Sequence, residues 1–188
     1  MSKFNKHKTE ELNSSVLYRI DRFFDKSIDI IGRVIALLLL LMIFNVLYDV
    51  GMRYFFQNSS VGMQELEWHI FSVVIMFGLG YALNKEAHVR VDFLYDNFKN
   101  RTKAYINIIG TLLFLIPLAI LIIYGSYEFV MDAYTMNEIS QDPGGLTHRW
   151  IVKSLIPAGF IFLIYSAIGY IIKNIIILKE QKNKGSQC

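Results

Sequence analysis

Cysteine, proline and charge within the long apolar stretches are all scarce in this sequence. The 188 residues include one cysteine, Cys188, so no disulfide can form within the chain. The four histidines are scattered and show none of the spacings typical of haem or metal ligation. No Ser/His/Asp arrangement, cysteine cluster or glycine-rich phosphate loop stands in a usable context. We therefore expect that the protein is not an enzyme and that it binds neither a cofactor nor a metal ion.

Four apolar stretches are almost free of charge, and they cover residues 34–50, 68–83, 105–127 and 154–172. Together they contain one charged side chain, Asp49. A helix needs roughly 20 mostly apolar residues to cross a bilayer core about 30 Å thick. The sequence therefore predicts an all-α integral membrane protein with four transmembrane helices in one membrane domain, residues 32–178. The expected spans are 32–53, 66–84, 105–127 and 151–174, and the third is expected to continue beyond the outer face to about residue 138.

The basic residues predict the orientation in the membrane. Of the 19 lysines and arginines, 16 lie in three segments, residues 3–33, 85–103 and 173–184, which are on one side of the membrane in a four-span topology. The opposite side, including the adjoining ends of the spans, has only Arg53, Arg149 and Lys153. Under the positive-inside rule, this split places both termini in the cytoplasm, with a flexible N-terminus at 1–13 and a tail at 179–188. Because the basic residues flank the spans, the net charge of +3 does not indicate a nucleic acid partner.

Residues 14–31 precede the first span and have a different pattern. Apolar side chains recur there every three or four residues, and charged side chains fill the opposite face. Such an amphipathic helix is expected to lie along the cytoplasmic membrane surface with its apolar side in the interface. A solvated helix that caps the bundle is the alternative. No cleavable signal peptide is expected, because the apolar run starts late and is too long.

Charged residues near the outer membrane face have local explanations. Asp49 and Arg53 lie one helical turn apart, and we expect them to form a structural ion pair near the interface. Glu65 and Glu67 lie in the first turn of the second helix, where the helix dipole favours negative charge. A salt bridge to a partner protein is an equal alternative for these two glutamates.

Tryptophan, glycine and proline mark further positions along the spans. Trp68 and Trp150 are expected at the outer interface. Gly78 and Gly80 are small enough to permit close approach of another helix. Pro117, near the middle of the third span, should either bend it or be tolerated through contacts with neighbouring helices. Pro157 is expected in the early turns of the fourth span, where a missing N–H donor costs least.

A longer pattern joins many of these residues. Its members are Glu65, Trp68, Gly78, Gly80, His88, Arg90, Asp92, Gly144, Gly145, Arg149, Trp150, Lys153 and Pro157. In order and spacing it resembles the small membrane subunit of tripartite ATP-independent periplasmic (TRAP) transporters, the DctQ-like family. The resemblance covers about residues 34–172 and agrees with a four-span topology that has both ends inside.

The resemblance implies a multi-pass protein of the bacterial inner membrane that is bound to a much larger DctM-like membrane subunit. That subunit would carry the substrate and sodium sites and move like an elevator, and a DctP-like periplasmic binding protein would deliver an organic acid. The small subunit would then anchor and widen the static scaffold. Its expected partners are these two proteins and membrane lipids.

The charged residues of the second and third connections have two possible roles each. His88, Arg90 and Asp92 either stabilise their own turn or contact the large subunit. Arg149 and Lys153 either anchor the chain at the outer headgroups or help to dock the binding protein.

Two rival functions remain open at this point. The chain could be an autonomous carrier or channel that forms a homo-oligomer, with Asn45, Asp49 and Asn107 lining a path. It could also anchor a redox complex in the membrane. Broken helices at matching positions and ionisable groups at mid-membrane, which are typical of carriers that act alone, are not visible.

Overall fold

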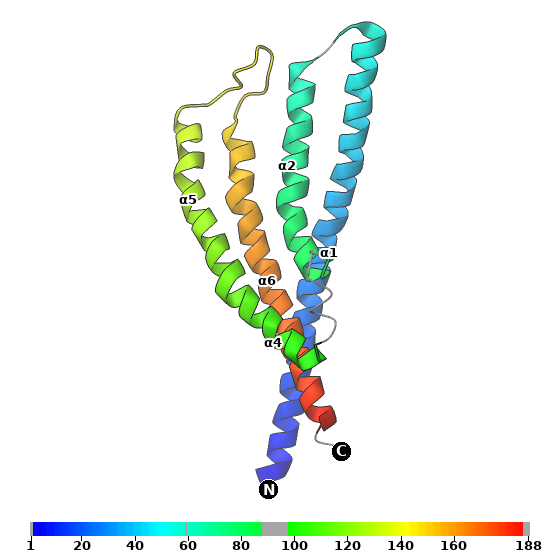
Figure 1. Ribbon diagram of the computed structural model, residues 1–188, viewed down its shortest axis with the longest axis vertical. Coiled ribbons are helices and arrows are strands. Elements are labelled where there is room, and N and C mark those ends of the chain that lie inside the picture. The colour runs from blue at the N-terminus through cyan, green and yellow to red at the C-terminus, as the bar shows by residue number, and fades with distance from the viewer. Residues whose placement is uncertain (1, 59, 88–97, 186–188) are drawn as a thin grey trace.

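The computed structural model describes residues 2–58, 60–87 and 98–185, and its regular elements there are all helices (Figure 1). The helices are α1 (Ser2–Phe56), α2 (Val61–Asn84), α4 (Asn100–Gly110), the π-helical turn η1 (Thr111–Leu115), α5 (Ile116–Thr135) and α6 (Trp150–Gly185). Because α4, η1 and α5 follow one another without a break, they form one long helical unit. This unit, α1, α2 and α6 are each long and apolar enough to cross a membrane. The predicted all-α fold with four spans is thereby confirmed.

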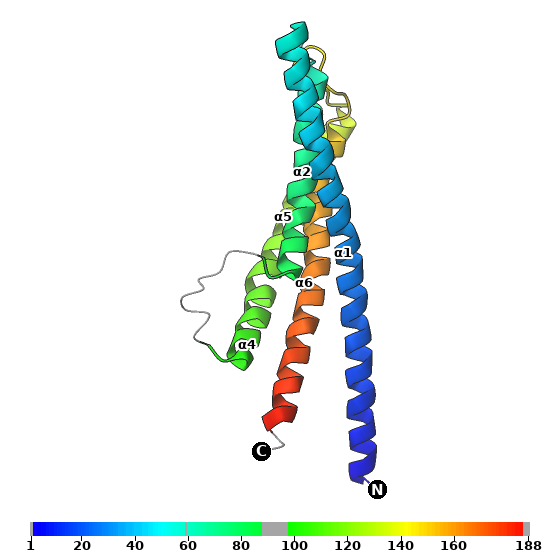
Figure 2. The same cartoon turned by 90° about the vertical axis from the view of Figure 1, so that its right-hand side faces the viewer.

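Helix α6 is the centre of the bundle. It packs against α1, α2, α4 and α5, whereas α1 packs only against α2 and α6 in extensive contacts. Figure 1 shows the halves of α5, α6, α2 and α1 that lie away from the termini, side by side in that order, and Figure 2 shows this layer from its edge. Both termini lie at the same end of the molecule, as an even number of spans requires. The outward faces of α1 and α5 are rich in exposed Leu, Ile and Phe, which suits contact with lipid or with another membrane protein.

Small residues let the helices approach α6 closely. Gly80 of α2 lies against Phe162 and Ser166 of α6, and a Cβ atom there would come within 2.7 Å of the Phe162 ring. Gly159 of α6 gives similar room to Met76 of α2. Nearer the end of the bundle where the termini lie, Leu83, Ala167 and Tyr170 form a buried apolar cluster. Close packing of this kind drives helix association where lipid tails are as apolar as the side chains.

Helix α1 is continuous where the sequence suggested two boundaries. It begins at Ser2 and runs to Phe56, so the structure has no break at residue 14 or at residue 32. Nothing in this stretch stops a helix: it contains no proline, and Gly32 accommodates the ring of Tyr81, which a Cβ atom would overlap. The position of residues 14–31 relative to the membrane surface stays a prediction.

Helix α2 begins earlier and helix α6 ends later than the predicted spans 66–84 and 151–174. The first turn of α2 starts at Val61, five residues before the expected beginning. At its other end α6 extends through Gly185, into residues expected to form a tail. Hydrophobicity marks the part of a helix that lies in the bilayer, whereas backbone hydrogen bonding continues into water.

The two prolines within the spans have different effects. Pro117 is the second residue of α5 and lies just after η1, and the wider π-helical turn gives room for its ring and its missing N–H, so the regular α-helix is interrupted beside this proline. The expectation for Pro157 is wrong. It lies inside α6, which begins at Trp150, so its missing N–H removes a hydrogen bond from the helix interior and not from an unbonded first turn.

Candidate functional site

The N-terminal end of α2 is joined to the loop between α5 and α6 through one carboxylate. Glu65 accepts a hydrogen bond from the Ser140 hydroxyl and another from the Leu146 backbone N–H, the latter at 2.5 Å. Glu65 lies in α2, and both donors lie in the loop at residues 136–149. The carboxylate therefore fixes the loop against a helix that is distant in sequence.

The loop has the backbone geometry that this contact needs. Gly144 has a φ of +85°, a conformation that side chains rarely tolerate. A Cβ atom on Gly145 would lie 2.9 Å from the Glu65 carboxylate and would collide with Ser140. A backbone hydrogen bond from the Ser140 N–H to the Leu146 carbonyl (3.1 Å) closes the loop on itself. The Gly144–Gly145 pair is thus explained by the turn and by the space that Glu65 occupies.

Two residues at the start of α6 also pack within the chain. Trp150 lies edge-on to Tyr134 of α5, with 5.4 Å between the ring centroids. Lys153 forms an ion pair with Glu138 and lies 4.1 Å from the centre of the Phe129 ring. In contrast, the Trp68 side chain is 68% exposed.

The ion pair predicted at the end of the first span is present. Arg53 lies 2.5 Å from Asp49, whose side chain is only 5% exposed. One turn earlier, the Asn45 amide donates a hydrogen bond to the Met63 carbonyl of α2, at 3.1 Å. The ion pair connects neighbouring turns of α1, and the Asn45 hydrogen bond joins α1 to α2. Each of these polar side chains therefore has a partner within the chain.

Polar contacts also join the helices at the other end of the bundle, where the termini lie. Lys85, just after α2, lies 2.6 Å from Asp29 of α1. The hydrogen bond that the Lys85 ammonium donates to the Asp29 carboxylate raises the pKa of the lysine. Between α4 and α6, the Asn107 amide donates to the Asn174 side chain at 3.0 Å, and Asn174 is fully buried.

The predicted site residues divide into several groups. Glu65, Gly144 and Gly145 come together in the outer loop, and Gly80 lies between α2 and α6. Gly78 instead faces open space, with no atom within 4 Å of a Cβ atom placed on it. The sequence did not single out Ser140 or Asn174, because each contacts residues distant in sequence. His88, Arg90 and Asp92 lie outside the described residues.

The chemistry of the described side chains is that of structural support. No group of three or more His, Cys, Asp or Glu side chains among them could hold a metal ion. The contacts of Glu65, Asn45, Lys85 and Asn107 each connect one helix or loop to another. The fold and these contacts define a multi-pass helical membrane protein in which several polar side chains join neighbouring helices.

Comparison with known proteins gives the family. Residues 42–176, more than half of the chain, match the family model for the DctQ component of tripartite ATP-independent periplasmic transporters. The chain belongs to this family, which is a transporter component and not an enzyme. It is therefore a TRAP small permease subunit of a bacterial membrane, and membership implies a large membrane subunit and a binding protein as partners.

Two relatives from Haemophilus influenzae agree with this assignment. A protein named as a putative TRAP transporter small permease protein is 26% identical over 119 residues, which cover 63% of this chain and 70% of that protein. The sialic acid TRAP transporter permease protein SiaT is 25% identical over 103 residues. That match covers 55% of this chain but only 16% of the longer SiaT protein.

Proposed function

We propose that this chain is the fixed support of an elevator-type large subunit in sodium-coupled uptake of an organic acid. In this role it carries no substrate and instead anchors the immobile part of the large subunit in the bilayer. A binding protein delivers the substrate on the periplasmic side, and both termini of the chain lie in the cytoplasm. Membership of the DctQ family is the observation on which this proposal mainly depends.

The contacts at both ends of the bundle support this role. A support must resist the force that a moving domain exerts, so its helices should not shift relative to one another. Glu65 fixes the outer loop, whereas Lys85 and Asn174 join helices at the inner end. Between these ends, α6 packs closely against its neighbours through glycines. The chain therefore has the features expected of a rigid body.

The outward face of α2 is our proposed contact with the large subunit. Gly78 lies on this face and has no neighbour in the bundle, although glycine weakens a helix relative to alanine. A partner helix approaching closely would explain its presence. Ile75 and Leu79 on the same face are 40% and 46% exposed, and they would flank such a helix. Arg149 and the outer loop are proposed to face the binding protein.

Co-purification tests the proposed contact. Gly78→Leu should leave the small subunit folded but reduce recovery of the large subunit, because the side chain would occupy the approach of the partner helix. Gly125→Leu, at an exposed glycine of α5 that also has no neighbour within 4 Å, is the matched control and should leave recovery unchanged. Unchanged recovery with Gly78→Leu would rule out this face as the contact.

Transport by vesicles tests the role as a support. Vesicles that contain the large and small subunits with the binding protein should accumulate the organic acid in the presence of a sodium gradient. Vesicles with this chain alone should show no flux. Flux through the isolated chain would favour the rival function, an autonomous oligomeric carrier.

A further inference from the structure

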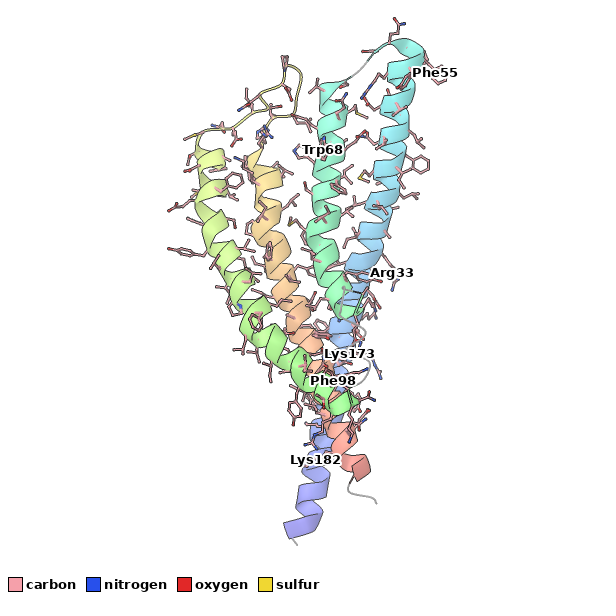
Figure 3. The ribbon with its side chains drawn as sticks, in the orientation of Figure 1. Arg33, Phe55, Trp68, Phe98, Lys173 and Lys182 are labelled. Carbon is pink, nitrogen blue, oxygen red and sulfur yellow. The ribbon has the colours of Figure 1, made fainter. Side chains whose placement is uncertain are left out.

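One face of α1 carries a stripe of positive charge near the N-terminal side of the membrane. We call it the basic stripe, and it consists of Arg19, Arg22, Lys26 and Arg33. These side chains are all exposed. Their separations of three, four and seven residues place them on one side of the helix. Figure 3 shows Arg33 pointing outward from α1.

The basic stripe has no carboxylate partner among the side chains that the structure describes, which cover residues 16–58, 60–87 and 98–182. This separates it from Arg53, Lys85 and Lys153, each of which pairs with an aspartate or glutamate. The lack of a partner is a consequence of its position on α1. The opposite face of the helix, including Phe24 and the fully buried Ile28, is the one that packs into the bundle.

The depth of the basic stripe can be derived from one ion pair and one longer-range electrostatic interaction between α1 and its neighbours. Lys85, the first charged residue after the second span, pairs with Asp29 of α1. On α6, Lys173 is the first charged residue after Lys153, about 30 Å away along a helix, and its charge acts on Asp21 of α1. The edge of the hydrocarbon therefore meets α1 between Asp21 and Asp29, a stretch of about 12 Å.

The basic stripe brackets this edge. Arg22 and Lys26 lie within the 12 Å stretch, and Arg19 and Arg33 lie within about 6 Å beyond it, which their long side chains can reach across. Beside the basic stripe runs a second exposed row, which is apolar and continues toward the membrane interior. Its members are Val16, Ile20, Phe23, Ile30, Val34 and Leu37. Cations beside an apolar row at this depth match the phosphate and acyl parts of a phospholipid.

We propose that the basic stripe binds anionic phospholipids of the leaflet on the N-terminal side, which the predicted topology makes the cytoplasmic leaflet. The lipid phosphates accept hydrogen bonds from the arginines and from Lys26 and neutralise their charge, while the acyl chains contact the apolar row. This interaction holds the inner half of α1 at a fixed depth. It requires only that the chain spans a membrane, and so it does not depend on the proposed role in transport.

Native mass spectrometry of the purified protein tests this proposal. The protein is extracted from nanodiscs that contain equimolar phosphatidylglycerol and phosphatidylcholine, and the ratio of the two lipids that remain bound is measured. Arg22→Gln/Lys26→Gln should reduce the preference for phosphatidylglycerol at least about fivefold, since each cation near an anionic surface contributes roughly that factor. Both positions are exposed, so folding should be unaffected, and size-exclusion chromatography checks this.

The matched control is Lys179→Gln/Lys182→Gln, which removes the same charge from exposed positions on α6. These lysines lie about 9 to 13 Å beyond Lys173, outside the hydrocarbon edge, and their removal should change the ratio less than about twofold. Equal losses in both variants would attribute the preference to net charge and overturn the proposal. So would wild-type protein without any preference. A third outcome would also overturn the proposal. If Arg22→Gln/Lys26→Gln leaves the lipid ratio unchanged but reduces co-purification of the large subunit, the basic stripe binds a protein partner and not lipid.

Discussion

Adding one methyl group to α2 should have opposite effects at two glycines that are separated by a single residue. In Gly80→Ala the new Cβ atom lies 2.7 Å from the ring of Phe162 and 2.9 Å from the hydroxyl oxygen of Ser166, whereas ordinary contacts begin at 3.4 Å. Phe162 is only 7% exposed, so its ring has little room to turn away. Helices α2 and α6 must then separate by several tenths of an ångström. Overpacking of this kind costs about 1–3 kcal/mol.

In Gly78→Ala the new Cβ atom has no neighbour within 4 Å in this chain. The substitution only replaces glycine by the best helix former, which favours the helix by up to about 1 kcal/mol. The free energies of unfolding of the two variants should therefore differ by about 1–4 kcal/mol. Unfolding of the isolated subunit in increasing SDS, followed by tryptophan fluorescence, measures this difference.

A second substitution tests the cause. If the Phe162 ring is the obstacle, Gly80→Ala should destabilise the Phe162→Leu background less than it destabilises the wild-type protein, because the smaller side chain leaves room for the methyl group. Equal unfolding free energies for Gly78→Ala and Gly80→Ala would refute the close packing of α2 on α6. An undiminished effect of Gly80→Ala in the Phe162→Leu background would refute the role of the ring.

Three further outcomes are expected. Glu65→Ala should speed hydrogen exchange of the Leu146 amide, because this amide loses its hydrogen-bond acceptor. The control Asp142→Asn, at an exposed position of the same loop, should leave the exchange rate unchanged. Equal exchange rates in the two variants would contradict the contact between Glu65 and the loop. Asn174→Ala should lower the free energy of unfolding by about 1 kcal/mol, because a hydrogen bond between α4 and α6 is lost. Unfolding in SDS measures this change. An unchanged midpoint of the SDS unfolding curve would contradict a stabilising role for this hydrogen bond. Cys188, the only cysteine, should react with a membrane-impermeant maleimide in inside-out vesicles but not in intact spheroplasts, and the reverse result would exclude a cytoplasmic C-terminus.

The helical class and the number of spans could be predicted from hydrophobicity, because each apolar stretch has the length that a bilayer demands. The Asp49–Arg53 pair was also predictable, since its members lie one turn apart on the same helix. Helix ends were predicted less well. The amphipathic pattern of residues 14–31 indicated a separate helix, but the backbone of α1 continues straight through it, because a change of surface polarity does not interrupt hydrogen bonding along a helix.

The roles of single residues depended on tertiary contacts. Glu65 suits the first turn of a helix by its charge alone, yet its carboxylate reaches Leu146, 81 residues later in the sequence. Gly78 and Gly80 look equivalent in the sequence, and only the position of α6 distinguishes a packed glycine from an open one.

The sequence by itself therefore determined the properties that depend on local composition: that the chain is helical, that it has four stretches able to cross a membrane and where charge is tolerated. The tertiary structure decided which helix became the centre and which polar groups met, because those outcomes depend on how separate helices pack. Local composition cannot specify such packing, since lipid and a neighbouring helix offer an apolar side chain nearly the same environment.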